Sequence, residues 1–133
     1  MKIVPYTKSP QVTAELVDLI LYCQNTEAHL DIKMAEQADV FNIEDYYQAT
    51  GGNFWLALDH GKVVGCVGLL ALNQTVSVLK KFFTYPDYRG QPQHLGQQLF
   101  NQFEAYIDQV TSLTQIVLDT PAAEQHSHYF YEK

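Results

Sequence analysis

The apolar residues near the start of the chain change from a strand-like run to a helical spacing. Residues 2–6 form a short, mainly apolar run, which predicts a first strand. Ser9 followed by Pro10 predicts a helix start, because serine is a good N-cap and proline fits the first helical position. The apolar stripe that continues this helix to about residue 24 consists of Leu16, Val17, Ile20 and Cys23.

The middle of the chain has the pattern of a more polar helix followed by a meander of strands. The second helix is expected over residues 34–48 with an interruption near Phe41-Asn42, and a glycine pair ends the pattern. Apolar runs at residues 53–58 and 62–72 are separated by a short turn containing glycine at residues 59–61, which predicts an antiparallel hairpin. Residues 76–84 then continue the meander as a third strand.

The last third of the chain predicts a long helix between two strands. Its apolar stripe consists of Leu95, Leu99, Phe103, Tyr106, Ile107 and Val110. A short buried strand is expected at residues 116–118 and a last helix at residues 122–133. The order β-α-α-β-β-β-α-β-α fits one domain, residues 1–133. Because the long helix joins two strands in a βαβ unit, we expect an α+β fold with a mixed sheet flanked by helices.

The stretch FFTYPDYRGQPQHLGQQLF, residues 82–100, carries the clearest chemical signal. It reads as a strand, a basic turn containing glycine, and the first turns of the long helix. The first amides of a helix lack backbone acceptors, and the helix dipole is positive there, so such a turn is a site for phosphate or another anion. The plainer alternative is a solvent-exposed turn that only caps the helix.

Residues 91–96, QPQHLG, resemble the pyrophosphate-binding signature of the GNAT acetyltransferases, Q/R-x-x-G-x-G/A, with His94 in place of the first glycine. Three further segments resemble family motifs and follow in the family's order. They are YPDYRG before the loop, LDT at the end of a strand, and FYEK near the chain end (residues 85–90, 118–120 and 130–133). The predicted element order is also that of the GNAT fold up to its fourth helix.

The resemblance implies acetyl-CoA as the acetyl donor and an amine as the acceptor. It also implies that backbone groups of Phe82, Phe83 and Thr84 hold the pantetheine and the thioester. The tyrosine that protonates the departing thiolate in the family corresponds to Tyr131. The implied pyrophosphate-binding residues are Arg89, Gly90, Gln91, His94, Leu95, Gly96 and Gln97.

Several residues depart from the family pattern. The loop carries about two extra residues, and the His94 side chain either narrows the site or contacts the cofactor. Val78 stands where many members have a glutamate that helps to take up the amine proton, and Glu124 stands in place of a cofactor-contacting asparagine. The family continues beyond Lys133 with a Gly-Phe pair and two strands. Without them, the strand at residues 116–118 would be a sheet edge, and a homodimer could cover it.

Composition and charge narrow the class of protein further. The formal charge of −7 argues against a nucleic-acid binder, and the two cysteines, with no C-x-x-C spacing, are expected to be reduced and buried. No signal peptide and no apolar run of membrane-spanning length are seen, so we expect a soluble, cytoplasmic protein. His126 and His128 lack a third ligand, so no metal is expected.

The leading hypothesis is an N-acetyltransferase in which the primary amine of a small molecule or protein attacks acetyl-CoA directly, because no cysteine lies in the motif region. Tyr46 and Tyr47 fit a packing role, but the resemblance implies that their region walls the acceptor pocket, where Asp39, Glu44 and Asp45 could add negative charge. Two alternatives remain open. One is a GNAT-like domain that binds acyl-CoA or a protein partner without efficient catalysis, which His94, Val78 and the missing C-terminal strands of the family favour. The other is an unrelated α+β interaction domain without affinity for CoA.

Overall fold

The protein is represented by a computed structural model that describes residues 1–110, 113–119 and 126–130. It contains one six-stranded sheet with the strands in chain order. Only β4 and β5 pair in parallel, and all other neighbours are antiparallel, so the expected mixed α+β sheet is confirmed. The strands are β1 (Lys2–Pro5), β2 (Asn53–Asp59), β3 (Lys62–Ala71), β4 (Val76–Thr84), β5 (Gln115–Asp119) and β6 (His126–Phe130).

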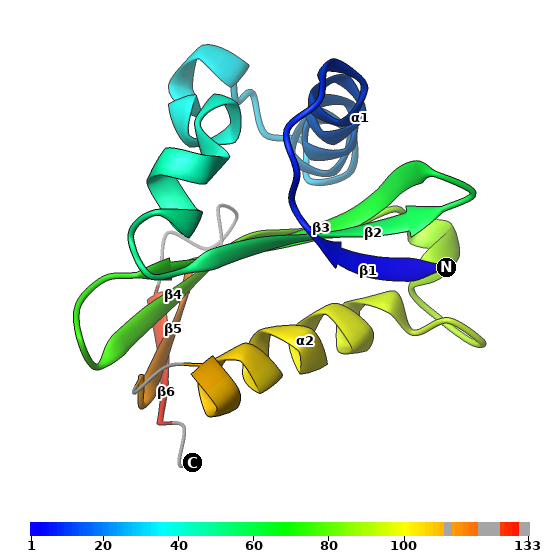
Figure 1. Cartoon of the computed structure of the whole chain (residues 1–133). Helices are drawn as coiled ribbons and strands as arrows, with labels where there is room; N and C mark the ends of the chain where they lie inside the picture. Colours follow the sequence, from blue (N-terminus) through cyan, green and yellow to red (C-terminus); the bar gives the residue numbers. More distant parts are fainter. Residues whose placement is uncertain (111–112, 120–125, 131–133) are drawn as a thin grey trace.

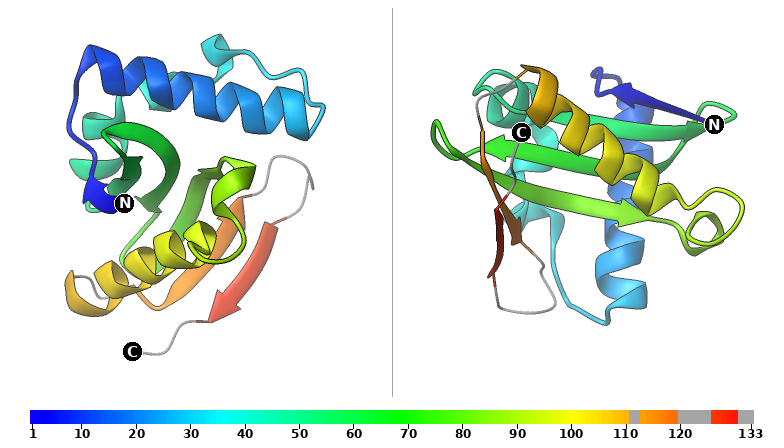
Figure 2. Two further views of the ribbon diagram at one scale, coloured as in Figure 1. Left: turned by 90° about the vertical axis from the view of Figure 1, so that its right-hand side faces the viewer. Right: turned by 90° about the horizontal axis from the view of Figure 1, so that it is seen from below.

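Helices cover both faces of the sheet (Figures 1 and 2). On one face lie α1 (Pro10–Leu21), its π-helical continuation η1 (Tyr22–Glu27) and the short turns that follow. On the other face lies α2 (Leu95–Val110), preceded by the 3₁₀ turn η5 (Pro86–Tyr88). The Ser9 side chain accepts from the Val12 amide at 3.0 Å, which confirms the predicted N-cap of α1.

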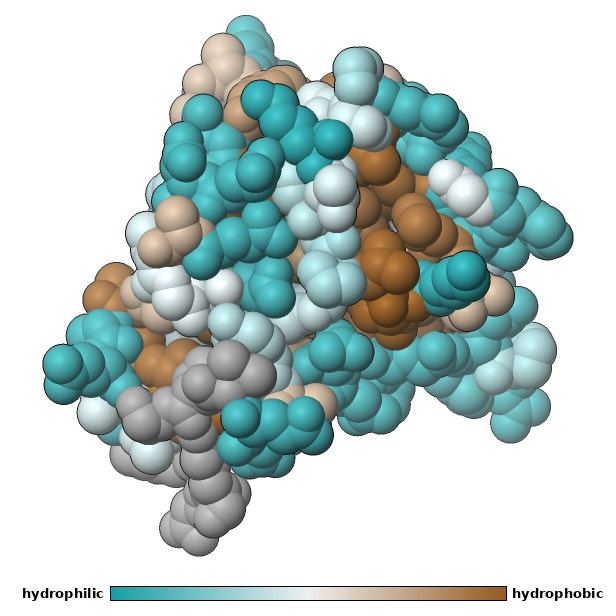
Figure 3. Space-filling model, viewed as in Figure 1, coloured by the Kyte–Doolittle hydropathy of each residue, from teal (hydrophilic) through white to brown (hydrophobic). Residues whose placement is uncertain are grey.

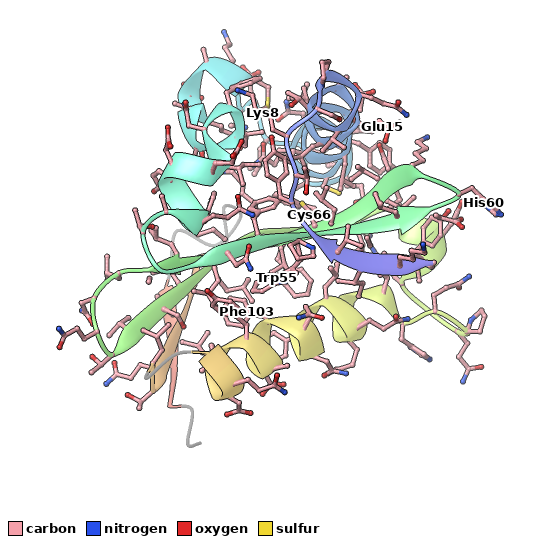
Figure 4. The ribbon with its side chains drawn as sticks, viewed as in Figure 1. Lys8, Glu15, Trp55, His60, Cys66 and Phe103 are labelled. Atoms are coloured by element: carbon pink, nitrogen blue, oxygen red, sulfur yellow. The ribbon has the colours of Figure 1, made fainter. Side chains whose placement is uncertain are left out.

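The core has one layer on each face of the sheet, because alternate side chains of a strand point to opposite sides. Phe54 and Leu56 pack against α1, whereas Trp55 packs against α2. Figure 4 shows Trp55 and Phe103 between the sheet and α2, and Cys66 on the side of α1. The face shown in Figure 3 is largely hydrophilic, with hydrophobic surface gathered in limited areas.

The predicted β2–β3 hairpin is present, and its turn residues explain it. His60 and Gly61 both have positive φ, 51° and 80°, as a two-residue type I′ turn requires. Asp59 and Lys62 are the paired residues that close it. The long helix is also where the apolar stripe placed it.

The helix predicted over residues 34–48 with an interruption near Phe41-Asn42 is not a regular α-helix. The break at Asn42 agrees with the expected interruption, whereas the break at Gln37 was not expected. The segment instead forms η2 (Met34–Glu36), η3 (Ala38–Phe41) and η4 (Glu44–Gln48). Gln37 and Asn42 leave helical geometry, with φ, ψ of −125°, 56° and −139°, 41°. A buried pair of side-chain amides, Gln24 with Gln37, ties this segment to η1 through bonds of 3.0 and 2.8 Å.

The last helix, predicted at residues 122–133, is wrong where the structure describes it. Residues His126–Phe130 form β6, which pairs antiparallel with β5 from Gln115↔Phe130 to Asp119↔His126. A neighbouring strand satisfies the backbone groups along the outer edge of β5, which a helix would leave unpaired. The bare β5 edge that suggested a homodimer is therefore covered within the chain.

The contact between α2 and the sheet should dominate stability. Leu99 is fully buried, so Leu99→Ala should lower the free energy of unfolding by about 2–4 kcal/mol through lost burial and a residual cavity. Urea denaturation followed by circular dichroism measures this. Leu72→Ala is the matched control, because Leu72 is 61% exposed and its truncation should change stability little. Equal effects of the two substitutions would contradict the assigned core.

Candidate functional site

The parallel pairing of β4 with β5 ends before β4 does. The paired residues run from Val76↔Gln115 to Leu79↔Leu118, whereas β4 continues to Thr84. Beyond this point β4 lies next to β3 alone among the described strands. The end of β4 is therefore open on the side where the sheet would otherwise continue.

A β-bulge shapes this open end of β4. Lys81 and Phe82 together oppose Val67, because the register shifts between Cys66↔Phe83 and Gly68↔Lys80. Lys81 has a left-handed φ of 53°, and its carbonyl accepts from the Cys66 thiol at 3.0 Å. After the bulge, Phe82 packs with the core on the α2 side and Phe83 with the core on the α1 side.

The loop after β4 delivers free backbone amides to the same place. His94 N–H donates to the Gly90 carbonyl at 2.9 Å, and Gln98 N–H donates to the His94 carbonyl at 3.2 Å. Between these two bonds lie the amides of Leu95, Gly96 and Gln97, to which no backbone carbonyl of the described residues is bonded. These are the orphan donors at a helix start, where an anion is favoured.

His94 adopts the backbone conformation that glycine usually supplies. Its φ of 45° lies in the left-handed region, which costs a non-glycine residue about 1–2 kcal/mol. The structure thus explains why glycine is expected at this position and shows that the chain makes the same turn without it. The cost is local, and His94 is one of the residues that line the cavity described next.

A cavity of about 610 Å³ lies between the end of η1, the end of β4 and the start of α2. That volume is in the range of small-molecule sites, about 300–1,000 Å³. Of the predicted cofactor residues, Gly90, Gln91 and Leu95 do not line it, and the Leu95 side chain is buried in the core. Its lining residues are Cys23, Glu27, Ala28, Phe82, Phe83, Thr84, Arg89, His94, Gly96 and Gln97.

Sequence reasoning missed the wall supplied by Cys23, Glu27 and Ala28. Cys23 and Glu27 lie in η1, where π-helical geometry follows α1, and such segments are frequent at functional sites. Cys23 was assigned only to the apolar stripe of the helix. The partners of these residues lie more than 60 positions along the chain, so no local pattern marks them.

Arg89 is held in this wall by Glu27 and Thr84. Its NH1 and NH2 groups donate to Glu27 Oε2 and Oε1 at 2.8 and 2.5 Å. Its Nε donates to Thr84 Oγ1 at 3.1 Å, and NH2 also donates to the Thr84 carbonyl at 2.5 Å. The hydrogen bonds from Arg89 hold the pKa of Glu27 below its ordinary value, so this carboxylate is charged at neutral pH.

Cys23 lies beside this ion pair but is held as a neutral thiol. Its Sγ–H donates to the Thr84 carbonyl at 3.4 Å. Burial first, and then the negative charge of Glu27, raise the pKa of Cys23 to about 11. At neutral pH very little thiolate is therefore present.

The residues suggested for the acceptor pocket form a different arrangement from the one expected. Asp39 is not a free anion, because its Oδ2 accepts from the Tyr47 hydroxyl at 2.6 Å and lies 3.7 Å from Lys81 Nζ. Tyr47 is fully buried as a packing residue. Tyr46 is partly exposed, and its hydroxyl accepts from Lys80 Nζ at 3.1 Å. The bulge of β4 thus brings two lysines to this face.

Some predictions fall outside the described residues. Tyr131 and Glu124 belong to segments 131–133 and 120–125, so the structure does not locate them. Within residues 1–110, 113–119 and 126–130, no three metal-ligating side chains gather in a way that would hold an ion. In the same part of the chain, no helix has the length and apolar character needed to cross a membrane.

Comparisons with known proteins show which family this chain resembles. A sequence model of the acetyltransferase (GNAT) family matches residues 18–133. An acetyltransferase from Streptococcus agalactiae 2603 is 54% identical, with 93% of this chain and 75% of that chain covered and a TM-score of 0.88. A GNAT-family acetyltransferase from Staphylococcus aureus Mu50 is 32% identical, with 90% and 73% covered and a TM-score of 0.79.

More distant structures share the fold. An aminoglycoside 6′-N-acetyltransferase solved in complex with coenzyme A is 20% identical, with a TM-score of 0.66 and 90% of this chain and 62% of that chain covered. The comparison with curated proteins gives no match. The extent of the family match and the identity to the two bacterial acetyltransferases agree with the open β4 end and the free backbone amides at the start of α2. The chain belongs to the GNAT family of acetyltransferases.

Proposed function

We propose that the protein transfers the acetyl group of acetyl-CoA to a primary amine by direct attack within a ternary complex. The observation that carries the proposal is the cavity that joins the open end of β4 to the free amides at the start of α2. Family membership supports acetyl transfer in general. The amine and the direct attack are supported by the chemistry of the site.

The residues of the cavity fit an acyl-CoA. The amides of Leu95, Gly96 and Gln97 would bind the pyrophosphate, since they lack backbone acceptors. Gly96 leaves room for it, because an added Cβ would meet only the Phe82 ring at 3.8 Å. The pantetheine would lie along β4 beyond Leu79, where the backbone has no β5 neighbour. The bound cofactor supplies an activated acetyl group as a thioester.

The residues around the thioester position favour direct attack by the amine over an acyl-enzyme. Cys23 lines the cavity, so the absence of a cysteine from the motif region does not by itself exclude a covalent route. The raised pKa of Cys23 does argue against it, because a neutral thiol is a poor nucleophile. Backbone amides near Phe82 and Phe83 would polarise the thioester carbonyl. Tyr131 would protonate the departing thiolate.

A second function, acyl-CoA binding without efficient turnover, is favoured by one feature of the described site. Val78 pairs with Val117 of β5 and offers no carboxylate at the position where many family members have one. Turnover with any amine distinguishes the two functions, because a binding domain would show affinity for CoA alone.

The first experiment is calorimetric titration with CoA and acetyl-CoA, followed by an assay of thiol release with primary amines. Gly96→Asp should abolish CoA binding and leave the fold intact, because a carboxylate would face the pyrophosphate. Gly96→Ala is the matched control, since the space around Gly96 accepts a methyl group. Unchanged CoA affinity in Gly96→Asp would contradict the proposal that the start of α2 binds the pyrophosphate.

Cys23→Ser tests direct attack. The variant should keep the acetylation rate within about twofold, because a thiol that is not the nucleophile is dispensable to the chemistry. Steady-state kinetics with the best amine and intact-mass spectrometry after incubation with acetyl-CoA provide the measurements. A large loss of rate together with acetylated Cys23 in the wild-type protein would show a covalent route instead.

Tyr131→Phe tests the proposed proton donor. Turnover should fall on the order of 100-fold or more, the contribution typical of a general acid, while CoA affinity stays near normal. Tyr106→Phe is the control, because the Tyr106 hydroxyl contacts the Gly52 carbonyl at 3.2 Å and lies outside the cavity. Full activity of Tyr131→Phe would assign Tyr131 a packing role only.

A further inference from the structure

Arg89 is the cationic residue among those that line the cavity, yet a carboxylate in the same wall balances its charge. The Glu27 side chain accepts from both terminal nitrogens of Arg89. A cofactor that carries several phosphate charges would therefore meet a wall with no net positive charge. This arrangement is unexpected for a site that binds a polyanion, because Glu27 offsets the positive charge that Arg89 would otherwise present to the ligand.

Most of the hydrogen-bond donors of Arg89 are already used within the protein, so few remain for a phosphate. Of its five N–H donors, Nε–H contacts Thr84 Oγ1, and the two on NH2 contact Glu27 and the Thr84 carbonyl. NH1 uses one donor for Glu27. One N–H of NH1 remains for a ligand, so Glu27 withholds both charge and donors.

Thr84 would keep Arg89 in place without Glu27. Two of the contacts of the guanidinium are to Thr84 atoms, and Thr84 is buried at the end of β4 with 7% of its surface exposed. The Arg89 side chain, which is 44% exposed, therefore has an anchor that does not depend on the carboxylate. Loss of the Glu27 charge would free the positive charge of Arg89 at an unchanged position.

We propose that Glu27 sets the affinity of the site for the pyrophosphate of CoA by neutralising Arg89, and that it thereby speeds release of the CoA product. This inference rests on the proposed function. Product release limits turnover in many enzymes, so weakened product binding is a useful property. Glu27 acts through Arg89 and is a positioning residue, not a catalytic one.

The experiment compares Glu27→Gln with wild type by calorimetry, using CoA, dephospho-CoA and pantetheine as probes. Glutamine keeps the shape and one hydrogen bond to Arg89 but removes the charge. CoA and dephospho-CoA should each bind about three- to tenfold more tightly, the size expected for one partly exposed charge near a phosphate. Pantetheine lacks phosphate, so its affinity should not change.

Glu104→Gln is the matched control for loss of one negative charge. Glu104 lies on α2 about 10 Å further along the helix than Gln97, which is about one Debye length at physiological salt. Its CoA affinity should equal that of wild type. The gain in Glu27→Gln should also shrink as salt rises, which a merely structural change would not produce.

Stopped-flow measurement of CoA dissociation completes the test, and the rate should be lower in Glu27→Gln by a factor similar to the gain in affinity. Weaker or equal CoA binding in Glu27→Gln, or an equal change for pantetheine, would overturn the inference and leave Glu27 as a structural clamp of the loop. Failure of the wild-type protein to bind CoA would instead refute the proposed function. The two failures are therefore distinguishable.

Discussion

The separation of β4 from β5 is the constraint on which the site depends. The two strands pair in parallel only as far as Leu79. Beyond that residue β4 has no β5 neighbour and continues beside β3 through the bulge at Lys81. Because α2 is the connection between these strands, its start must lie beside the free end of β4. Backbone amides of a helix and an open strand end are thereby brought to one cavity, which is what a long ligand with a phosphate at one end requires.

In the proposed cofactor site, backbone amides are the main groups available to bind an anion. The chain carries a formal charge of −7, and the guanidinium of Arg89 is already paired with Glu27. The helix start contributes partial positive charge without any side chain, so it is not cancelled by a neighbouring carboxylate. The proposed site therefore depends on the left-handed turn at His94 and on the absence of a charged side chain at position 96.

Local patterns predicted the elements that local physics controls. The N-cap at Ser9, the hairpin turn at His60-Gly61 and the stripe of α2 are all set by residues close together in sequence. The features that the sequence did not predict, the break at Gln37 and the last strand in place of a helix, depend on distant partners. The conformation of residues 34–48 depends on the buried contact of Gln37 with Gln24. Residues 126–130 form a strand because they pair with the outer edge of β5. The spacing of apolar residues along the chain carries no information on either of these long-range contacts.

By itself the sequence determined the mixed α+β class, the glycine-containing turn that begins α2 and the similarity to the GNAT family. These follow from spacing and from residues whose backbone preferences are local. Only the tertiary structure decided that Cys23 and Glu27 wall the cavity and that Arg89 is neutralised there. The reason is physical: these contacts join residues 61 and 62 positions apart, and their energies depend on burial and distance, which exist only once the chain has folded.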